Sequence, residues 1–99
     1  MPIFAVHYEY SAATVPGRDA HRPAHRTWLA GLLTSGTLLT SGPYPDGSGA
    51  LLLFRSASPA ELQGLLARDP FAREGLIDDV RVVEWVPVLG AFTAEATTA

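Results

Sequence analysis

The order in which strand-like and helix-like segments follow one another constrains the fold of this chain more than any other feature. Four segments show the alternation or the short apolar runs that are typical of strands: residues 3–10, 37–41, 50–55 and 80–87. Two segments have apolar residues at helical spacing, residues 19–35 and residues 59 to about 69. The order is therefore β-α-β-β-α-β, which predicts an α+β, ferredoxin-like fold with both helices on one face of a four-stranded antiparallel sheet.

Local signals mark the ends of both helices. Asp19 is a suitable N-cap for the first helix, Pro23 then lies near its first turn, and Gly36 is suited to end it. Residues 11–18, with Pro16-Gly17, are interpreted as a loop. Ser58-Pro59-Ala60-Glu61 combines a capping box with proline in the first turn, which predicts a sharp start for the second helix.

The length of the chain favours one domain that associates with a second copy. With 99 residues we expect a single domain over residues 1–92, followed by a small, polar tail over residues 93–99 that frays. A domain of this size buries only about 60–65% of its unfolded surface. Because Phe4, Val6, Leu52 and Trp85 are expected on the sheet face away from the helices, we predict a homodimer that packs sheet against sheet.

Composition excludes several classes of function. The chain has no cysteine, so thiol nucleophiles and iron–sulfur clusters are ruled out. Its net charge is −3 and its seven basic residues, all arginines, are spread along the sequence, so we expect neither nucleic-acid nor membrane binding. No apolar run reaches the length of a membrane span, and no nucleotide-binding glycine motif is present. The N-terminus does not have the pattern of a signal peptide, so we expect a cytoplasmic protein. We also expect the protein to need no cofactor.

Two separated motifs carry the candidate chemistry. Arg22-Pro23-Ala24-His25 places an imidazole near the start of the first helix, and Asp69-Pro70 places a carboxylate at the end of the second. If the fold brings them together, Asp69 can hold His25 in one tautomer and raise its basicity. The alternative is a structural histidine, with Asp69 accepting backbone N–H groups in the turn at Pro70.

The other candidate residues have ordinary explanations as well. Arg22 can hold an anionic group of a substrate or pair with Asp19 or Glu9 on the surface. Ser41, Gly42 and Pro43 can present a hydroxyl and a backbone N–H to a substrate oxygen, or can simply end a strand. Phe71 adjoins Asp69 and can form one wall of a cavity. The metal-type spacing of His21 and His25 has no third ligand nearby in sequence, so we expect no metal.

Taken together, these motifs resemble the YCII-related (YciI-like) proteins of the dimeric α+β barrel superfamily. The resemblance covers residues 3 to 90, roughly, in order; its main elements are Arg22 to His25, Gly36 to Pro43, the apolar strand 50–54, Asp69-Pro70-Phe71 and the strand 80–85. It implies a ferredoxin-like fold, a dimer joined through its sheets and a site built on a His–Asp pair, here His25 and Asp69. One departure is the short segment between Pro43 and Gly49, which in the family borders the pocket.

The resemblance also implies a range of activities rather than one. Some members are similar to dehydrochlorinases that act on chlorinated hydroxyquinols, and relatives in the superfamily include muconolactone isomerases and small monooxygenases. The first hypothesis is thus a cofactor-independent acid–base enzyme for a small, oxygen-rich or aromatic compound. The alternatives are a module that binds a small molecule without changing it, and an interaction domain in which the pair only stabilises the fold.

Overall fold

The computed structural model describes residues 1–96 and has the predicted order of elements. Its strands are β1 (Ile3–Glu9), β2 (Leu38–Pro43), β3 (Gly49–Arg55) and β4 (Asp79–Trp85). Its helices are α1 (Val15–Ser35), α2 (Pro59–Leu66) and the single turn α3 (Pro70–Arg73), with short 3₁₀ turns at Ala12–Thr14 and Ala94–Ala96. The sheet order is β2-β3-β1-β4 and every neighbouring pair is antiparallel, so the predicted ferredoxin-like fold is confirmed.

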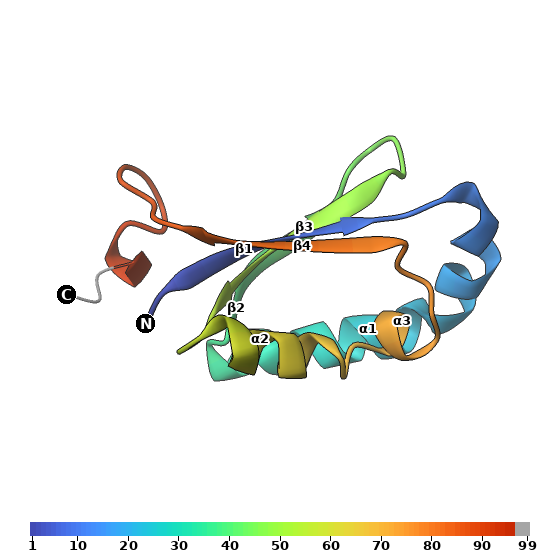
Figure 1. Ribbon diagram of the computed structural model, residues 1–99, viewed down its shortest axis with the longest axis horizontal. Helices are drawn as coiled ribbons and strands as arrows, with labels where there is room; N and C mark the ends of the chain where they lie inside the picture. Colours follow the sequence, from blue (N-terminus) through green and yellow to red (C-terminus); the bar gives the residue numbers. More distant parts are fainter. Residues whose placement is uncertain (97–99) are drawn as a thin grey trace.

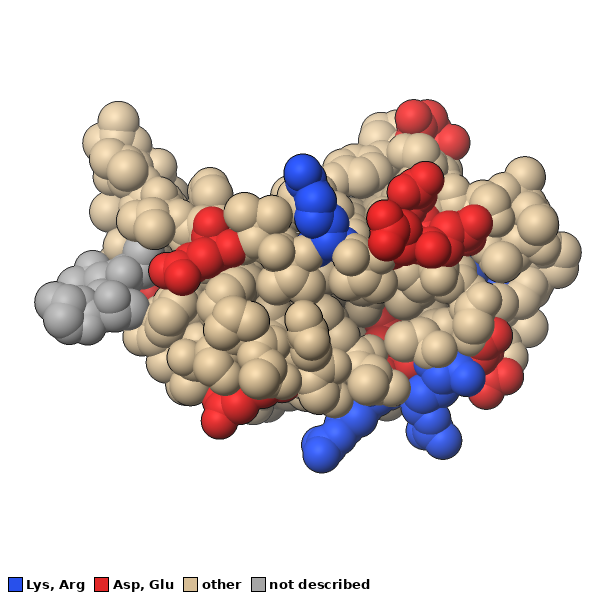
Figure 2. All heavy atoms as spheres, viewed as in Figure 1, with Lys and Arg blue, Asp and Glu red and all other residues tan. Residues whose placement is uncertain are grey.

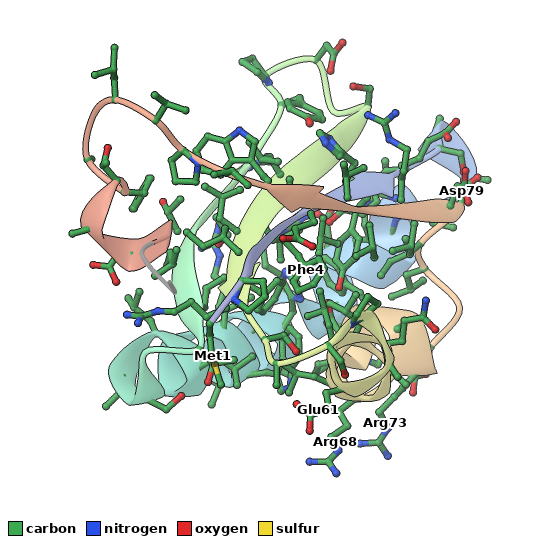
Figure 3. All side chains as sticks on the ribbon, turned by 60° about the vertical axis from the view of Figure 1, so that its left-hand side comes forward. Met1, Phe4, Glu61, Arg68, Arg73 and Asp79 are labelled. Carbon is green, nitrogen blue, oxygen red and sulfur yellow. The ribbon has the colours of Figure 1, made fainter. Side chains whose placement is uncertain are left out.

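All three helices lie on one face of the sheet (Figure 1). The main core between these layers is formed by buried side chains of the sheet and of α2: Phe4, Val6, Tyr8, Leu38, Ala50, Leu52, Phe54, Leu62 and Leu66. Phe4 points from β1 toward the helices (Figure 3). This corrects the expectation that Phe4, Val6 and Leu52 lie on the opposite face. The strands are apolar on both faces, and a period of two does not tell which face meets the helices.

The opposite face of the sheet has a smaller apolar cluster. Ile3, Ala5 and Leu53 are buried there, and Phe92 from the C-terminal segment packs against them. Trp85 pairs with Ile3 and lies on this face, as expected, with 39% of its surface exposed. The C-terminal segment therefore covers part of this face and leaves the β4 side open.

The first helix begins earlier than predicted, at Val15 instead of Asp19. Pro16 lies in its first turn, where the missing N–H of proline leaves no hydrogen bond unmade, so Pro16-Gly17 starts a helix rather than forming a loop. Pro23 consequently lies inside the helix and not near its start; it removes one hydrogen bond without ending α1. The C-terminal end is as predicted, at Gly36 with a φ of 82°.

The second helix begins as the capping box predicts. The Ser58 side chain accepts a hydrogen bond from the Glu61 backbone N–H at 3.2 Å. The helix ends at Leu66, short of the expected residues 68–69. At the C-terminus, Glu95 lies within the 3₁₀ turn and pairs with Arg55 at 2.7 Å. Residues 97–99 of the expected tail lie outside the described residues, so fraying of the tail stays a prediction.

Two features of the described residues concern nucleic acid and membrane, neither of which the sequence leads us to expect as a partner. On the face shown in Figure 2, acidic and basic side chains are interspersed among uncharged ones, and no continuous basic stripe forms. Within residues 1–96, none of the helices combines the length and apolar character that crossing a membrane requires.

Candidate active site

His25 and Asp69 meet at the centre of the helical layer. His25 Nδ1 lies 2.7 Å from Asp69 Oδ1, and the two residues are 9% and 0% exposed. Because α1 starts at Val15, His25 lies in the middle of the helix and not near its first turn. Asp69 does not end the second helix; it is the N-cap of α3, and Pro70 occupies the first turn. The two motifs are thus brought together, each from a different place in its helix than predicted.

Asp69 accepts hydrogen bonds from three separate segments. Besides His25, the Phe71 backbone N–H donates to Oδ1 at 2.9 Å, and the Tyr8 hydroxyl of β1 donates to Oδ2 at 2.7 Å. Both alternatives of the sequence argument are therefore present, since the carboxylate caps a helix and also holds the imidazole. The sequence argument did not single out Tyr8 for the site, although a tyrosine among inward-facing apolar residues signals a buried hydroxyl that needs a partner.

The hydrogen bonds to Asp69 determine which atoms of Tyr8 and His25 carry a proton. Burial, reinforced by the charge of Asp69, raises the pKa of the Tyr8 hydroxyl, so Tyr8 remains a donor. A carboxylate only accepts hydrogen bonds, so His25 donates from Nδ1. In the neutral ring, Nε2 then carries the lone pair, and it makes no hydrogen bond within residues 1–96. This is the tautomer of a general base.

Aromatic neighbours fix the plane of the imidazole. The Phe71 ring stacks on His25 with a centroid distance of 3.9 Å and an interplanar angle of 5°. Trp28, one turn nearer the C-terminal end of α1, lies with its ring centroid 6.4 Å from that of His25. The ring of His25 is therefore held at its edge by Asp69 and on its face by Phe71.

His25 forms part of the wall of a cavity of about 270 Å³. Helix α1 contributes Arg22, His25, Arg26 and Leu29 to this cavity, and β2 contributes Ser41, Gly42 and Pro43. The cavity is completed by Phe71, by Tyr10 just beyond the end of β1, and by Ala50 and Leu52 of β3. The structure thus brings all the candidate residues named from the sequence to one place, with Asp69 behind His25 and sealed from the cavity.

A β-bulge in β2 determines which side chains of that strand reach the cavity. The register shifts between Leu38 and Thr40, so that Ser41 pairs with Leu52 and Pro43 with Ala50. Without the shift, Ser41 would share the face of Leu51, away from the helices. A bulge re-aims the side chains that follow it, and here it turns Ser41 and Pro43 toward His25.

Of the remaining candidates, Arg22 belongs to the cavity wall and His21 does not. Arg22 contributes to the cavity wall and also pairs with Asp19 at 2.5 Å, so both roles considered from the sequence are compatible. His21 lies 3.7 Å from Glu74 on the surface, one turn away from His25. Within residues 1–96, no three potential metal-ligating side chains group together. Arg26 and Tyr10 were missed, although Arg26 follows Arg22 at the helical spacing of four.

A larger hollow of about 380 Å³ lies elsewhere, between α2, α3 and β4. The side chains around it are Gln63, Leu66, Ala67, Ala72, Val80 and Val82. None of these is titratable, so this hollow has no group that can transfer a proton. The smaller cavity beside His25 is the candidate active site.

The chain is thus a small α+β protein with a ferredoxin-like fold, and it has a histidine hydrogen-bonded to an aspartate beside a small cavity. The chain matches the YCII-related domain over residues 2–86 and belongs to that family. Among curated protein sequences, no match is found.

Solved structures of low sequence identity share the fold. One is 5-chloro-2-hydroxyhydroquinone dehydrochlorinase (TftG) from Burkholderia phenoliruptrix AC1100, in complex with 2,5-dihydroxybenzoquinone. It is 22% identical with a TM-score of 0.75, over 84% of this chain and 92% of that one. An antibiotic biosynthesis monooxygenase is 14% identical with a TM-score of 0.59, over 90% and 100% of the two chains. Rv0793 from Mycobacterium tuberculosis is 17% identical with a TM-score of 0.53, over 92% and 99%.

Proposed function

We propose that this protein is a cofactor-independent acid–base enzyme that acts on a small oxygen-rich or aromatic compound by elimination, such as dehydrochlorination, or by isomerisation. One observation carries the proposal: His25 is held through Nδ1 by the buried Asp69 and lines a cavity large enough for a small ring. The similarity in fold to a dehydrochlorinase agrees with this reaction class.

The proposed elimination begins with removal of a proton by His25 Nε2. The substrate reacts as its keto tautomer, in which the carbon that bears chlorine is tetrahedral, and the proton comes from a remaining hydroxyl or from a carbon beside the carbonyl group. The electron pair left behind forms a new double bond, and chloride departs with the electrons of its own bond. Arg22 and the Ser41 hydroxyl steady the negative charge that develops on the substrate oxygen, and Asp69 stabilises the imidazolium. In an isomerisation, the same imidazolium returns the proton to another carbon.

The test is turnover of chlorinated hydroxyhydroquinones, followed by chloride release, in the wild type and in His25→Asn. General acid–base catalysis contributes roughly 10²–10⁴-fold, so the variant is expected to lose activity by about that factor. His21→Asn is the matched control, because His21 lies on the same helix and at the surface. Circular dichroism and size-exclusion chromatography show whether His25→Asn keeps its fold. An active wild type whose rate survives in a folded His25→Asn would disprove the proposed role.

A second candidate is a binding module that uses the same cavity without chemistry. It is favoured by the three hydrogen bonds on Asp69, since they give the pair a structural role that needs no turnover. This candidate predicts that a small molecule copurifies with the protein and is recovered unchanged after long incubation. Recovery of a chemically altered product would exclude it.

We also propose that two copies associate through the open face of the sheet. Val83 and Trp85 of β4 lie on that face and are 44% and 39% exposed. Analytical ultracentrifugation is expected to find a dimer for the wild type and a monomer for Trp85→Glu. A wild type that sediments as a monomer at micromolar concentration would contradict this arrangement.

A further inference from the structure

We propose that the cavity beside His25 recognises an anion, and that its ligand is a small aromatic carboxylate held by Arg22 together with Arg26. The inference rests on the proposed function only in that the same cavity receives the substrate. It adds the class of ligand, and it assigns a role to Arg26, which the sequence argument did not single out.

The charge of the cavity wall is the first observation. Among the described residues that form the wall, Arg22, Arg26 and His25 are basic and none carries a carboxylate. The protein as a whole has a net charge of −3, so this positive wall runs against the overall balance. Asp69 is not part of this wall: it is fully buried behind His25 and engaged in three hydrogen bonds, so it presents no carboxylate oxygen to a ligand.

A third arginine strengthens the positive field behind the wall. Arg18 lies one turn before Arg22 on α1, is 5% exposed, and places its guanidinium carbon 4.2 Å from the centre of the Tyr10 ring. It donates hydrogen bonds to the Ser11 carbonyl and to the Thr14 hydroxyl, neither of which is charged. Tyr10 is part of the cavity wall, so a cation whose hydrogen-bond partners are all uncharged lies against that wall, where it counters the charge of the buried Asp69.

The spacing of Arg22 and Arg26 is the second observation. Residues four apart lie on the same helix face, where two like charges destabilise the helix unless something neutralises them. Asp19 pairs with Arg22, whereas Arg26 has no acidic partner within residues 1–96. Because Asp19 already offsets the charge of Arg22, an oxyanion on this helix face neutralises chiefly Arg26, and the planar fork of arginine matches the two oxygens of a carboxylate.

The apolar side of the cavity and its volume determine the shape and size of the rest of the ligand. Leu29, Leu52 and the Phe71 ring are apolar, so they favour a flat hydrocarbon body. The volume of about 270 Å³ is below the range of roughly 300–1,000 Å³ that is typical of sites for drug-sized ligands, which limits the guest to a single substituted ring. A carboxylate at the arginines thereby fixes the orientation of the ring relative to His25.

The experiment compares acids with their neutral, equally shaped amides. Binding of benzoate, 2-hydroxybenzoate and 2,5-dihydroxybenzoate, each with its amide, is measured by calorimetry on the wild type, Arg26→Gln and Arg22→Gln. Arg68→Gln is the matched control, because Arg68 points into solvent away from the cavity (Figure 3). At least one acid is expected to bind ten-fold or more tightly than its amide. Arg26→Gln should weaken that acid by about ten- to a hundred-fold and leave the amide unchanged.

The outcomes separate this inference from the proposed enzymatic function. Equal affinity for acids and amides, no binding of any acid, or equal behaviour of Arg26→Gln and Arg68→Gln would each overturn the inference. His25→Asn should lower turnover by roughly 10²–10⁴-fold but keep the preference for the acid over the amide. Selective binding of the acid without turnover of any chlorinated hydroxyhydroquinone would refute the enzymatic proposal and support this one. Turnover of a chlorinated hydroxyhydroquinone together with equal affinity for acids and amides would support the enzymatic proposal and overturn this one.

Discussion

Replacing Asp69 by alanine is expected to cost more stability than any other single truncation at the site. The carboxylate is fully buried and accepts hydrogen bonds from His25, Tyr8 and the Phe71 backbone N–H. A hydrogen bond to a charged group contributes about 1.5–3 kcal/mol, and a lost N-cap costs about 1 kcal/mol. Asp69→Ala should therefore lower the free energy of unfolding by about 4–6 kcal/mol, a large part of the roughly 5–15 kcal/mol that holds a domain together.

Urea denaturation followed by circular dichroism measures this loss, with two further variants for comparison. Ser58→Ala removes an N-cap hydrogen bond to Glu61 and nothing else, so it should cost about 1 kcal/mol. Asp69→Asn keeps an acceptor for His25 and Phe71 and directs its amide group at Tyr8, whose hydroxyl can accept; we expect a loss of about 1–2 kcal/mol. If Asp69→Ala were no more destabilised than Ser58→Ala, the three hydrogen bonds would not have the role assigned to them.

Three further predictions concern β1 and the glycines. The raised pKa of Tyr8 means that the folded protein keeps a proton that the unfolded chain releases above about pH 10, so stability falls as the pH rises past that value. Tyr8→Phe should flatten this fall in urea midpoints measured at increasing alkaline pH, and identical slopes would contradict the burial of the hydroxyl. Gly49→Ala should destabilise by about 1–3 kcal/mol, because its Cβ would lie 1.9 Å from the Tyr8 carbonyl oxygen; a neutral effect in thermal unfolding would count against this contact. Gly64→Ala, inside α2 with open space around the new methyl group, should stabilise by about 0.5–1 kcal/mol in the same assay, and a loss of stability would argue against the helix there.

The order of elements and the second helix start could be read from the sequence because their signals are local. Ser58-Pro59 marks the beginning of α2 by its own side chain and ring, independent of the rest of the fold. The predicted start of α1 was wrong because Pro16-Gly17 is compatible both with a loop and with the first turn of a helix. Only the packing of the helix distinguishes the two. Gly17 lies close against Leu76, a contact between segments far apart in the chain.

The site was predictable as a set of residues but not as an arrangement. The family motif pointed to His25 and Asp69, and the structure puts them in hydrogen-bond contact. The role of Ser41 as a wall residue depends on a register shift in β2, for which the sequence has no local mark. Tyr8 belongs to the site through its hydroxyl alone, since its ring is part of the core.

The three hydrogen bonds on Asp69 have a consequence for how this family is compared. One carboxylate joins β1, α1 and α3, so a related chain needs that side chain to fold whether or not it catalyses a reaction. Retention of the acid and the imidazole in a related chain is thus weak evidence of turnover. Arg22 and Arg26, one turn apart on α1, join no such buried network, so under the ligand proposed for the cavity, differences there are the better guide to relatives with other ligands.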